Sequence, residues 1–307
     1  MKAAPMFTIR VPASTANLGP GFDSIGLAVS KYLTVDVFSH YKWECKAKTP
    51  LLQGVPEDEN NLLIETARGI AARYNKELPY CSLYLDSDIP LARGLGSSAS
   101  AIIAGIELAD QLCELHLSRR EKLLIATEIE GHIDNVGAAL YGGLIVGTYD
   151  GKDISFVSQP IHDVELVAVI PSYELKTIHA RDVLPSRLVY MDGIRGSGVA
   201  NVLVAALCKE DWVLAGEMMK RDVFHEPHRK QLVPELQKLH ELEHGNVYGV
   251  SLSGAGPTVL CYVKKGSADE VKIWLQSIFS HCVVETLQVV NEGVHIIHEQ
   301  QKPIESI

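Results

Sequence analysis

The segment from Pro90 to Ser100, PLARGLGSSAS, combines glycines and hydroxyl groups directly before a helical pattern. Gly94 and Gly96 can adopt backbone conformations that other residues avoid, and they let a ligand approach the main chain closely. The Ala-rich stretch from Ala99 to Leu115 predicts a helix, whose first turn offers unpaired N–H groups at the positive end of the helix dipole. This arrangement is suited to binding a phosphate group.

The segment does not match either of the two best-known nucleotide-binding motifs. No GK[ST] sequence follows the glycines, which excludes the Walker pattern, and two serines after Gly96 break the GxGxxG spacing. A turn with a serine cap is therefore an equally good interpretation of this segment taken alone. Neighbouring segments must decide between the two interpretations.

Two other segments have the same character. Val11 to Ala28, VPASTANLGPGFDSIGLA, places Asn17 and Asp23 among glycines and a proline, and Ser251 to Leu260 has the sequence SLSGAGPTVL. Alone, the first fits a hairpin or Ω-loop with local side-chain bonds, and the second fits a tight connection between strands. Their presence together in one chain favours a common ligand.

The three segments resemble the signature motifs of the GHMP kinase superfamily, and the likeness extends in order and spacing from residue 9 to residue 290. The form PASTANLGPGFDSIG resembles the members that phosphorylate homoserine. Asn61-Leu62 and EGHIDNVGAALYGG, Glu130 to Gly143, fit the same pattern. The resemblance implies an α+β fold, the GHMP kinase fold, with an N-terminal nucleotide-binding α/β lobe (residues 1–155) and a C-terminal ferredoxin-like α/β sandwich (residues 156–307).

This resemblance implies phosphoryl transfer from ATP, with Mg²⁺, to the side-chain hydroxyl of L-homoserine, a step of threonine biosynthesis. Such a reaction needs the phosphates held, their charge neutralised and the acceptor oxygen placed in line. Oxygen ligands suit Mg²⁺, so Ser98 and Glu130 are the expected metal ligands, although Glu130 alone would also fit a solvated acid at a helix end. The expected ATP-binding residues are Asn61, Pro90, Leu91, Ala92, Arg93, Gly94, Leu95, Gly96, Ser97, Ser98, Ala99 and Ser100.

The segment after Glu130 is expected to lie beside the acceptor hydroxyl. Asp134 either positions this hydroxyl or accepts its proton. Positioning can suffice, because a loose transition state needs little deprotonation before transfer. Asn135 stands where relatives of other specificity carry an aspartate, which argues against base catalysis. The expected catalytic residues are thus Glu130, Asp134 and Asn135.

An amino-acid acceptor carries one carboxylate and one ammonium group, so its site should offer both signs of charge. By resemblance, Arg181 and Arg229 meet the carboxylate, which arginine can hold through two parallel bonds. Taken alone, each arginine would fit a solvent-facing helix charge. Asp23, with Asn17 and His132, is expected at the ammonium end. The expected substrate-binding residues are Asn17, Asp23, His132, Asp134, Thr177, Arg181, Arg229 and Gly254.

Composition limits the class of protein and its partners. The 307 residues are 47% hydrophobic and 21% charged, as in a globular protein with two lobes. The formal net charge of −10 disfavours nucleic acid and anionic membranes as partners. Six scattered cysteines lack zinc-site spacing, and no apolar run of about 20 residues could span a bilayer. We expect a cytoplasmic protein with reduced thiols and a small-molecule substrate, and the resemblance implies a homodimer.

Alternating apolar runs and helical patterns predict the elements that must position these residues. Strands are predicted at Phe7–Val11, Leu33–Phe38, Ser82–Leu85, Leu144–Gly147, Glu165–Ile170, Val247–Ser251, Thr258–Val263 and Val283–Val290. Helices are predicted at Leu62–Tyr74, Ala99–Leu115, Arg119–Glu130, Gly198–Met219 and Pro234–His240, and from Ser267 to about Ser280. Capping boxes are predicted for Ser118 with Glu121 and for Ser267 with Glu270. The polar tail after His298 is expected to fray.

Two other functions remain open at this stage. One is a kinase of the same superfamily that acts on another alcohol, such as mevalonate or a sugar. The other is a non-catalytic protein of this fold that binds a metabolite or a partner. Such a protein should lack the metal ligand or have a broken phosphate loop, whereas Ser98 and Glu130 are both present.

Overall fold

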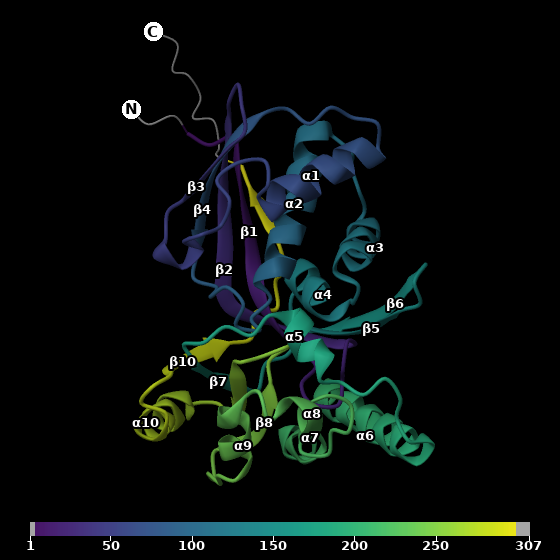
Figure 1. Cartoon of the computed structure of the whole chain (residues 1–307), viewed down its shortest axis with the longest axis vertical. Helices are drawn as coiled ribbons and strands as arrows, with labels where there is room; N and C mark the ends of the chain where they lie inside the picture. Colours follow the sequence, from purple (N-terminus) through teal and green to yellow (C-terminus); the bar gives the residue numbers. More distant parts are fainter. Residues whose placement is uncertain (1–3, 299–307) are drawn as a thin grey trace.

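The computed structural model describes residues 4–298, which form two lobes stacked along the long axis of the molecule (Figure 1). The tail after His298, where we expect fraying, lies outside the described residues. The strands of the first lobe are β1 (Phe7–Ala16), β2 (Ile25–Ser39), β3 (Glu44–Ala47), β4 (Cys81–Ser87), β5 (Leu144–Tyr149), β6 (Ile154–Gln159) and β11 (His295–Ile297). Its helices are α1 (Leu62–Arg73), α2 (Ser97–Cys113), α3 (Arg119–Glu130) and α4 (Asp134–Tyr141), with a short 3₁₀ turn at Pro50–Leu52.

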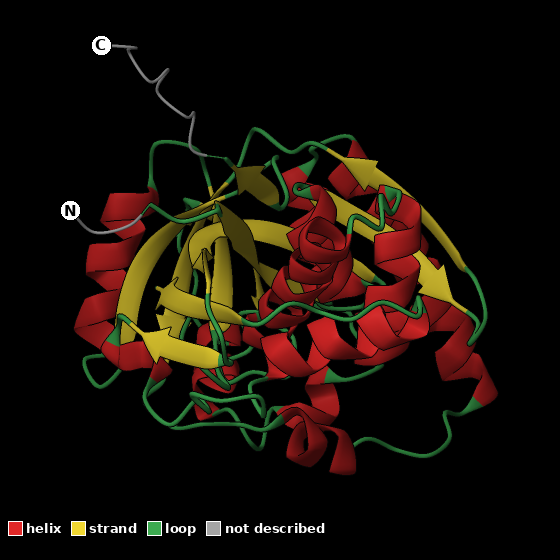
Figure 2. Ribbon diagram, turned by 90° about the horizontal axis from the view of Figure 1, so that it is seen from above, coloured by secondary structure: helices red, strands yellow, loops and turns green. Residues whose placement is uncertain are grey.

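The first lobe is built around a seven-stranded sheet in which β2 is the central strand. β2 pairs with β1, β4 and β5 along different parts of its length, and β11 adds an edge strand beside β1. Helices α2 and α4 pack against β1 and β2. Seen from above, the strands curve beside this group of helices (Figure 2).

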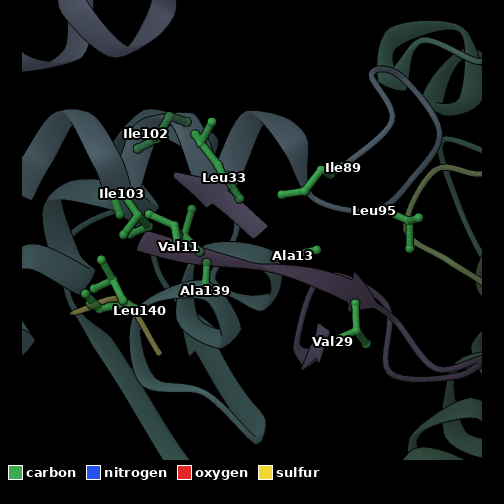
Figure 3. Close-up of a cluster of buried hydrophobic side chains, with 14 of the residues drawn as sticks. Val11, Ala13, Val29, Leu33, Ile89, Leu95, Ile102, Ile103, Ala139 and Leu140 are labelled. Atoms are coloured by element: carbon green, nitrogen blue, oxygen red, sulfur yellow. The ribbon is translucent and has the colours of Figure 1, made fainter. Parts of the chain in front are cut away.

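Buried apolar residues attach the start of α2 to this sheet. Val11 of β1 lies near Ile103 of α2 and Ala139 of α4, and all three are fully buried (Figure 3). Leu95, at the end of the glycine-serine loop, is also buried in this core. Because Leu95 is held in the core, the chain must turn at Gly96 to begin α2, and this fixes the direction of the helix.

The second lobe contains a four-stranded antiparallel sheet in the order β10-β7-β9-β8. Its strands are β7 (Glu165–Ile170), β8 (Val247–Leu252), β9 (Val259–Val263) and β10 (Val283–Gln288). Its helices are α5 (Thr177–Asp182), α6 (Tyr190–Cys208), α7 (Trp212–Met219), α8 (Glu226–Arg229), α9 (Pro234–His240) and α10 (Ala268–Ile278). The chain order of strands and helices is that of a ferredoxin-like sandwich, and the predicted α+β fold class is confirmed.

Both faces of the second sheet are buried. Val167 and Val169 of β7 pack with α9 and α10, whereas Leu166 and Ala168 of the same strand join the core shared with the first lobe. Side chains alternate between the two faces of a strand, so a strand covered on both sides needs a continuous apolar run, as in Glu165–Ile170. No helix within residues 4–298 combines the length and apolar composition needed to cross a membrane.

The division into lobes near residue 155 stays a prediction. That position lies within β6, which belongs to the first sheet, and the chain reaches the second sheet at Glu165. After β10 the chain returns to the first sheet as β11. The C-terminal segment therefore contributes to both lobes.

The predicted helix at Gly198–Met219 is two helices. α6 begins at Tyr190 and ends at Cys208, and α7 begins at Trp212. Glu210 has a φ of 54°, which a continuous helix does not allow, and the Asp211 side chain accepts a hydrogen bond from the N–H of Leu214 to start α7. Glycines within α6 lower its helix propensity, and the sequence pattern therefore placed its start too late.

The capping box predicted at Ser267 and Glu270 is wrong, whereas the box at the start of α3 is confirmed. Ser267 makes no side-chain cap. The carboxylate of Glu165, on β7, accepts hydrogen bonds from the N–H groups of Gly266 and Ala268 at 3.0 and 3.2 Å. A residue far away in the sequence therefore takes the role that the local pattern assigned to Ser267.

Candidate active site

The three segments singled out in the sequence meet where the two lobes join. The N–H of Ser14 donates to the carbonyl of Leu95 at 3.3 Å, and the N–H of Gly254 donates to the carbonyl of Ala16 at 3.1 Å. Ser253 Oγ donates to the carbonyl of Gly94 at 2.6 Å. The backbone of all three segments is therefore joined into one unit.

Gly94 and Gly96 are required by this close packing. Their φ angles are 77° and 71°, in the left-handed region that side chains disfavour. A Cβ atom on Gly96 would lie 2.2 Å from Ser14 Oγ, and one on Gly94 would lie 2.2 Å from the carbonyl oxygen of Ser253. Gly96 directly precedes α2, so the N–H groups of the first turn of the helix have no partner within the helix.

A cavity of about 300 Å³ opens at the start of α2. Both lobes contribute to its walls. It is lined by Asn17, Phe22, Asp23, Ala92, Gly94, Gly96, Ser97, Ser98, Glu130, His132, Asp134, Asn135, Leu175, Lys176, Thr177, Arg181, Arg229, Gly254, Ala255 and Gly256. The lining residues that the sequence did not lead us to expect are Phe22, Leu175, Lys176, Ala255 and Gly256, although Phe22, Ala255 and Gly256 lie within the motifs.

A second cavity of about 400 Å³ lies on the other side of the loop and shares Ala92, Ser97 and Ser98 with the first. Its walls are mainly apolar and include Leu91 and Val55. Asn61 also lines it, and the side chain of Asn61 caps α1 by accepting a hydrogen bond from the N–H of Leu63 at 3.0 Å. The two cavities meet at the N-terminal turn of α2.

Several of the predicted ATP-binding residues point into the protein interior. Leu95, Ala99 and Ser100 are buried and line neither cavity, and Ser100 Oγ donates to the carbonyl of Pro12 at 3.1 Å. Pro90 and Arg93 also line neither cavity.

Arg93 instead links the loop to the segment before α5. Its Nε and Nη2 donate to the carbonyls of Pro171 and Ser172 at 3.2 and 2.6 Å. The N–H of Leu175 donates to the carbonyl of Ala92 at 3.2 Å. These contacts hold the segment that leads to Thr177 and Arg181 against the glycine-serine loop, Pro90 to Ser100.

Ser98 and Glu130 lie together, as a shared ligand requires. Ser98 Oγ donates to Glu130 Oε2 at 3.2 Å. Burial raises the pKa of Glu130, although His132 and the Ser98 hydroxyl act in the opposite direction. The Ser98 hydroxyl and the partly desolvated Glu130 carboxylate together offer oxygen ligands of the kind that Mg²⁺ prefers.

Asp134 is the most buried acid of the cavity, with 1% of its surface exposed. Its Oδ1 atom lies 2.6 Å from His132 Nδ1 and accepts a hydrogen bond from the N–H of Asn135 at 2.6 Å. Asn135 Oδ1 in turn accepts from Ser14 Oγ at 2.9 Å. The carboxylate is therefore held in one orientation.

His132 carries a positive charge at neutral pH. Burial lowers its pKa, but the hydrogen bond to Asp134 and the charges of Asp134, Asp23 and Glu130 outweigh this effect and raise the pKa to about 9. A protonated imidazole repels an ammonium group, so the expected contact of His132 with the substrate ammonium conflicts with its charge. Asp23, His132 and Asp134 lie close enough together to share a metal ion, but His132 would have to lose its proton to bind one.

Asp23 and Arg181 pair with each other across the cavity. Arg181 Nη2 and Nη1 donate to the two carboxylate oxygens of Asp23 at 2.7 and 3.1 Å. The predicted receptors for the two charged groups of the acceptor are thus opposite ends of one ion pair. Asn17 lies beside them, but its amide already accepts from the N–H of Asp23 and donates to the carbonyl of Gly254.

Arg229 is buried, with 1% of its surface exposed, so it is not a solvent-facing helix charge. Its Nε donates to the carbonyl of Ala180 at 2.9 Å and its Nη1 donates to the carbonyl of Gly254 at 3.1 Å. Burial and the nearby charge of Arg181 lower its pKa to about 10, which leaves it charged at neutral pH. Thr177, at the start of α5, is exposed and lines the same cavity.

The comparisons with known proteins agree with this architecture. Residues 61–143 match the GHMP kinases N terminal domain, and residues 203–272 match the GHMP kinases C terminal family. Homoserine kinase of Bacillus velezensis is 48% identical over 307 residues, covering 100% of this chain and 98% of that protein. Homoserine kinase of Halalkalibacterium halodurans is 45% identical over 304 residues, covering 97% of this chain and 98% of that protein.

Solved structures show the same likeness. The homoserine kinase of Cytophaga hutchinsonii superimposes with a TM-score of 0.83 and 26% identity, covering 97% of this chain and 99% of that one. A mevalonate kinase structure has a TM-score of 0.67 at 18% identity, with 93% of this chain and 99% of that one covered, which shows the shared fold alone.

Fold and site together define a small-molecule kinase of the GHMP type. At this level of identity over the full length, the chain belongs to the homoserine kinase family within that class. It is therefore an enzyme, and the alternative of a non-catalytic binding protein is excluded.

Proposed function

We propose that the protein transfers the terminal phosphoryl group of ATP to the side-chain hydroxyl of L-homoserine and releases O-phospho-L-homoserine for threonine synthesis. The observation that best supports this proposal is the content of one cavity. It contains the start of a helix, an acid–hydroxyl pair and receptors for both charges of an α-amino acid. Names of relatives at 48% and 45% identity support the same acceptor.

ATP binds across both cavities in this proposal. The triphosphate lies at the start of α2, where backbone N–H groups and the helix dipole favour an anion. The adenosine occupies the mainly apolar cavity beside Asn61. Of the predicted loop residues, those that border the phosphates are Ala92, Gly94, Gly96, Ser97 and Ser98. Leu95, Ala99 and Ser100 are buried and attach the loop to the core of the first lobe.

Ser98 and Glu130 would hold Mg²⁺ beside the phosphates. When bound, the metal neutralises the negative charge that increases on the phosphate oxygens during transfer. Glu130 would supply the charge and Ser98 a neutral oxygen, and water would complete the ligand set.

When the acceptor binds, Asp23 and Arg181 give up their contact with each other and each binds one charged group of the acceptor. Asp23 takes the substrate ammonium, Arg181 takes the carboxylate together with Arg229, and Thr177 and Gly254 border the substrate. A ligand with only one charge leaves one residue of the pair without a partner. The site therefore favours a zwitterion over a simple alcohol.

Asp134 orients the acceptor hydroxyl. Asn135 holds Asp134 in place by donating a backbone hydrogen bond to it, and Asn135 is itself held by a hydrogen bond from Ser14. His132 Nδ1, the N–H of Asn135 and Asn135 Nδ2 already bond to Oδ1, so Oδ2 is the oxygen available to the hydroxyl. His132, which is charged, stabilises the carboxylate of Asp134. Positioning is sufficient for transfer through a loose transition state.

A panel of acceptors tests the proposal. Purified enzyme with ATP and Mg²⁺ is incubated with L-homoserine, mevalonate or galactose, and the phosphorylated product is identified by ³¹P NMR. We expect turnover with L-homoserine and at least 100-fold lower kcat/KM with the other two acceptors. Turnover with mevalonate or galactose but not with L-homoserine would assign the enzyme to another alcohol.

We further propose a cytoplasmic homodimer. All six cysteines are free thiols, which supports a reducing compartment. On α6, the exposed residues Met191, Ile194 and Val202 form an apolar stripe, and the helix is electrically neutral because Asp192 and Arg195 pair with each other. For two copies of a chain with net charge −10, contact through this neutral face adds no local repulsion to that between the net charges. Sedimentation should show a dimer that Ile194→Glu weakens; a wild-type monomer would contradict this.

A further inference from the structure

His225 is a buried histidine that lines neither cavity but contacts two parts of the acceptor site. It lies directly before α8 and has no exposed surface. Its Nε2 lies 2.8 Å from the carbonyl oxygen of Gly19, and its Nδ1 lies 3.3 Å from Nη1 of Arg229. Gly19 belongs to the turn that carries Asp23, whereas Arg229 belongs to the second lobe.

The partners of His225 fix its protonation. A carbonyl oxygen can only accept a hydrogen bond, so Nε2 must carry the proton. A guanidinium group can only donate, so Nδ1 must be the unprotonated nitrogen. These two hydrogen bonds favour a neutral imidazole with its proton on Nε2, and the carboxylate of Asp222 also lies 3.6 Å from this protonated nitrogen. A charged ring would face Arg229 with a second positive charge.

The ring of His225 also supports Phe22, the residue before Asp23. The two rings stack with centroids 5.2 Å apart and an angle of 20° between their planes. The Phe22 ring lies 5.2 Å from the guanidinium carbon of Arg229 and 5.4 Å from that of Arg181. Phe22 thus touches both arginines from the same turn that holds Asp23.

The backbone at His225 is itself fixed. The carboxylate of Asp222 accepts hydrogen bonds from the N–H groups of Phe224, His225 and Glu226 at 2.7, 3.1 and 2.8 Å. The backbone of His225 is bonded to Asp222 and its ring is buried, so His225 cannot move toward Gly19 or Arg229 without breaking these contacts.

We propose that His225 is a positioning residue that sets the spacing between the ammonium receptor and the carboxylate receptor of the acceptor site. It touches no substrate. It acts through Gly19 and Phe22 on Asp23, and directly on Arg229. This proposal rests on the proposed function in that the acceptor carries both charges.

The test uses variants that each keep one of the two hydrogen bonds. In His225→Asn the side-chain oxygen can replace Nδ1 and accept from Arg229, whereas in His225→Gln the side-chain NH₂ can replace Nε2 and donate to Gly19. His225→Leu keeps neither. His228→Leu, on the same helix, is the control, because His228 lines neither cavity.

For His225→Leu we expect KM for L-homoserine to rise at least tenfold while KM for ATP changes less than twofold, which corresponds to the loss of about one buried hydrogen bond. The Asn and Gln variants should lie between Leu and wild type. A wild-type KM for homoserine in His225→Leu, or an equal rise in both KM values, would overturn the proposal.

A measurement on the wild-type protein covers the case in which the Leu variant does not fold. Nitrogen NMR of ¹⁵N-histidine protein, with the His225 signal assigned by its absence from the His225→Asn spectrum, should show this imidazole with protonated Nε2 and bare Nδ1 at pH 7. A charged or Nδ1-protonated His225 would refute the proposal. If the acceptor panel identifies another alcohol as substrate, the proposed function fails, while this NMR result still reports on His225 alone.

Discussion

Replacing Asp23 by asparagine separates its role in binding from any role in folding. The change removes the charge and keeps the shape of the side chain. Side-chain exposures of 34% for Asp23 and 39% for Arg181 leave this ion pair partly in contact with water. Such pairs contribute at most about 1 kcal/mol to stability, so the free energy of unfolding should fall by less than that.

The effect on the acceptor should be much larger. A hydrogen bond to a charged group contributes about 1.5–3 kcal/mol, which corresponds to a decrease in kcat/KM for L-homoserine of about tenfold to 150-fold. KM for ATP should not change, because Asp23 lies on the acceptor side of the cavity and lines only the first cavity.

The decisive comparison uses 4-hydroxybutyrate, which is homoserine without the ammonium group. With this acceptor, Asp23→Asn should leave kcat/KM unchanged or raise it, because the change releases Arg181 for the carboxylate. Asp182→Asn, an exposed acid next to Arg181, is the matched control. An equal loss with both acceptors would refute the exchange of ion-pair partners and assign Asp23 a purely structural role.

Three further changes test other parts of the site. Glu130→Gln should remain folded but lose at least about 100-fold in kcat and need more Mg²⁺ for half-maximal rate; near-normal turnover would contradict the metal assignment. Gly96→Ala should lower the free energy of unfolding, measured in urea, by about 2–3 kcal/mol, because of the φ of 71° and the contact of the new Cβ with Ser14. Gly69→Ala is the control and should be neutral or stabilising, because its added Cβ meets nothing within 4 Å. His132 has a raised pKa of about 9 in the folded state, so its stabilising effect is complete below its ordinary pKa of 6.5 and disappears as pH rises through 9. The stability difference between wild type and His132→Gln should therefore shrink between pH 6.5 and pH 9.5, and a constant difference would contradict it.

The sequence was most informative where a residue type has one main structural use. Gly94 and Gly96 were expected to allow unusual backbone conformations, and both have positive φ angles. Local patterns failed where a distant residue determines the outcome. Glu165 caps α10 from another strand, and Arg229 is buried because carbonyl groups of Ala180 and Gly254 satisfy its N–H groups.

The pairing of Asp23 with Arg181 could not be predicted for a related reason. The two residues are 158 positions apart, and each was assigned to a different charge of the substrate. A motif reports which groups a ligand meets, but it does not report what those groups contact without the ligand. That contact depends on the distance between the lobes, which is set by packing and not by residue type.

The proposed acceptor site draws its residues from both lobes. Asn17 and Asp23 belong to the first lobe, together with the glycine-serine loop, whereas Arg181, Arg229 and Gly254 belong to the second. A shift of one lobe against the other would change the distance between the two charge receptors and the distance from the acceptor to the phosphates together. β7 and β9 resist such a shift because their side chains enter the cores on both sides of the second sheet. The apolar runs that look purely structural in the sequence therefore also set the geometry in which phosphoryl transfer takes place.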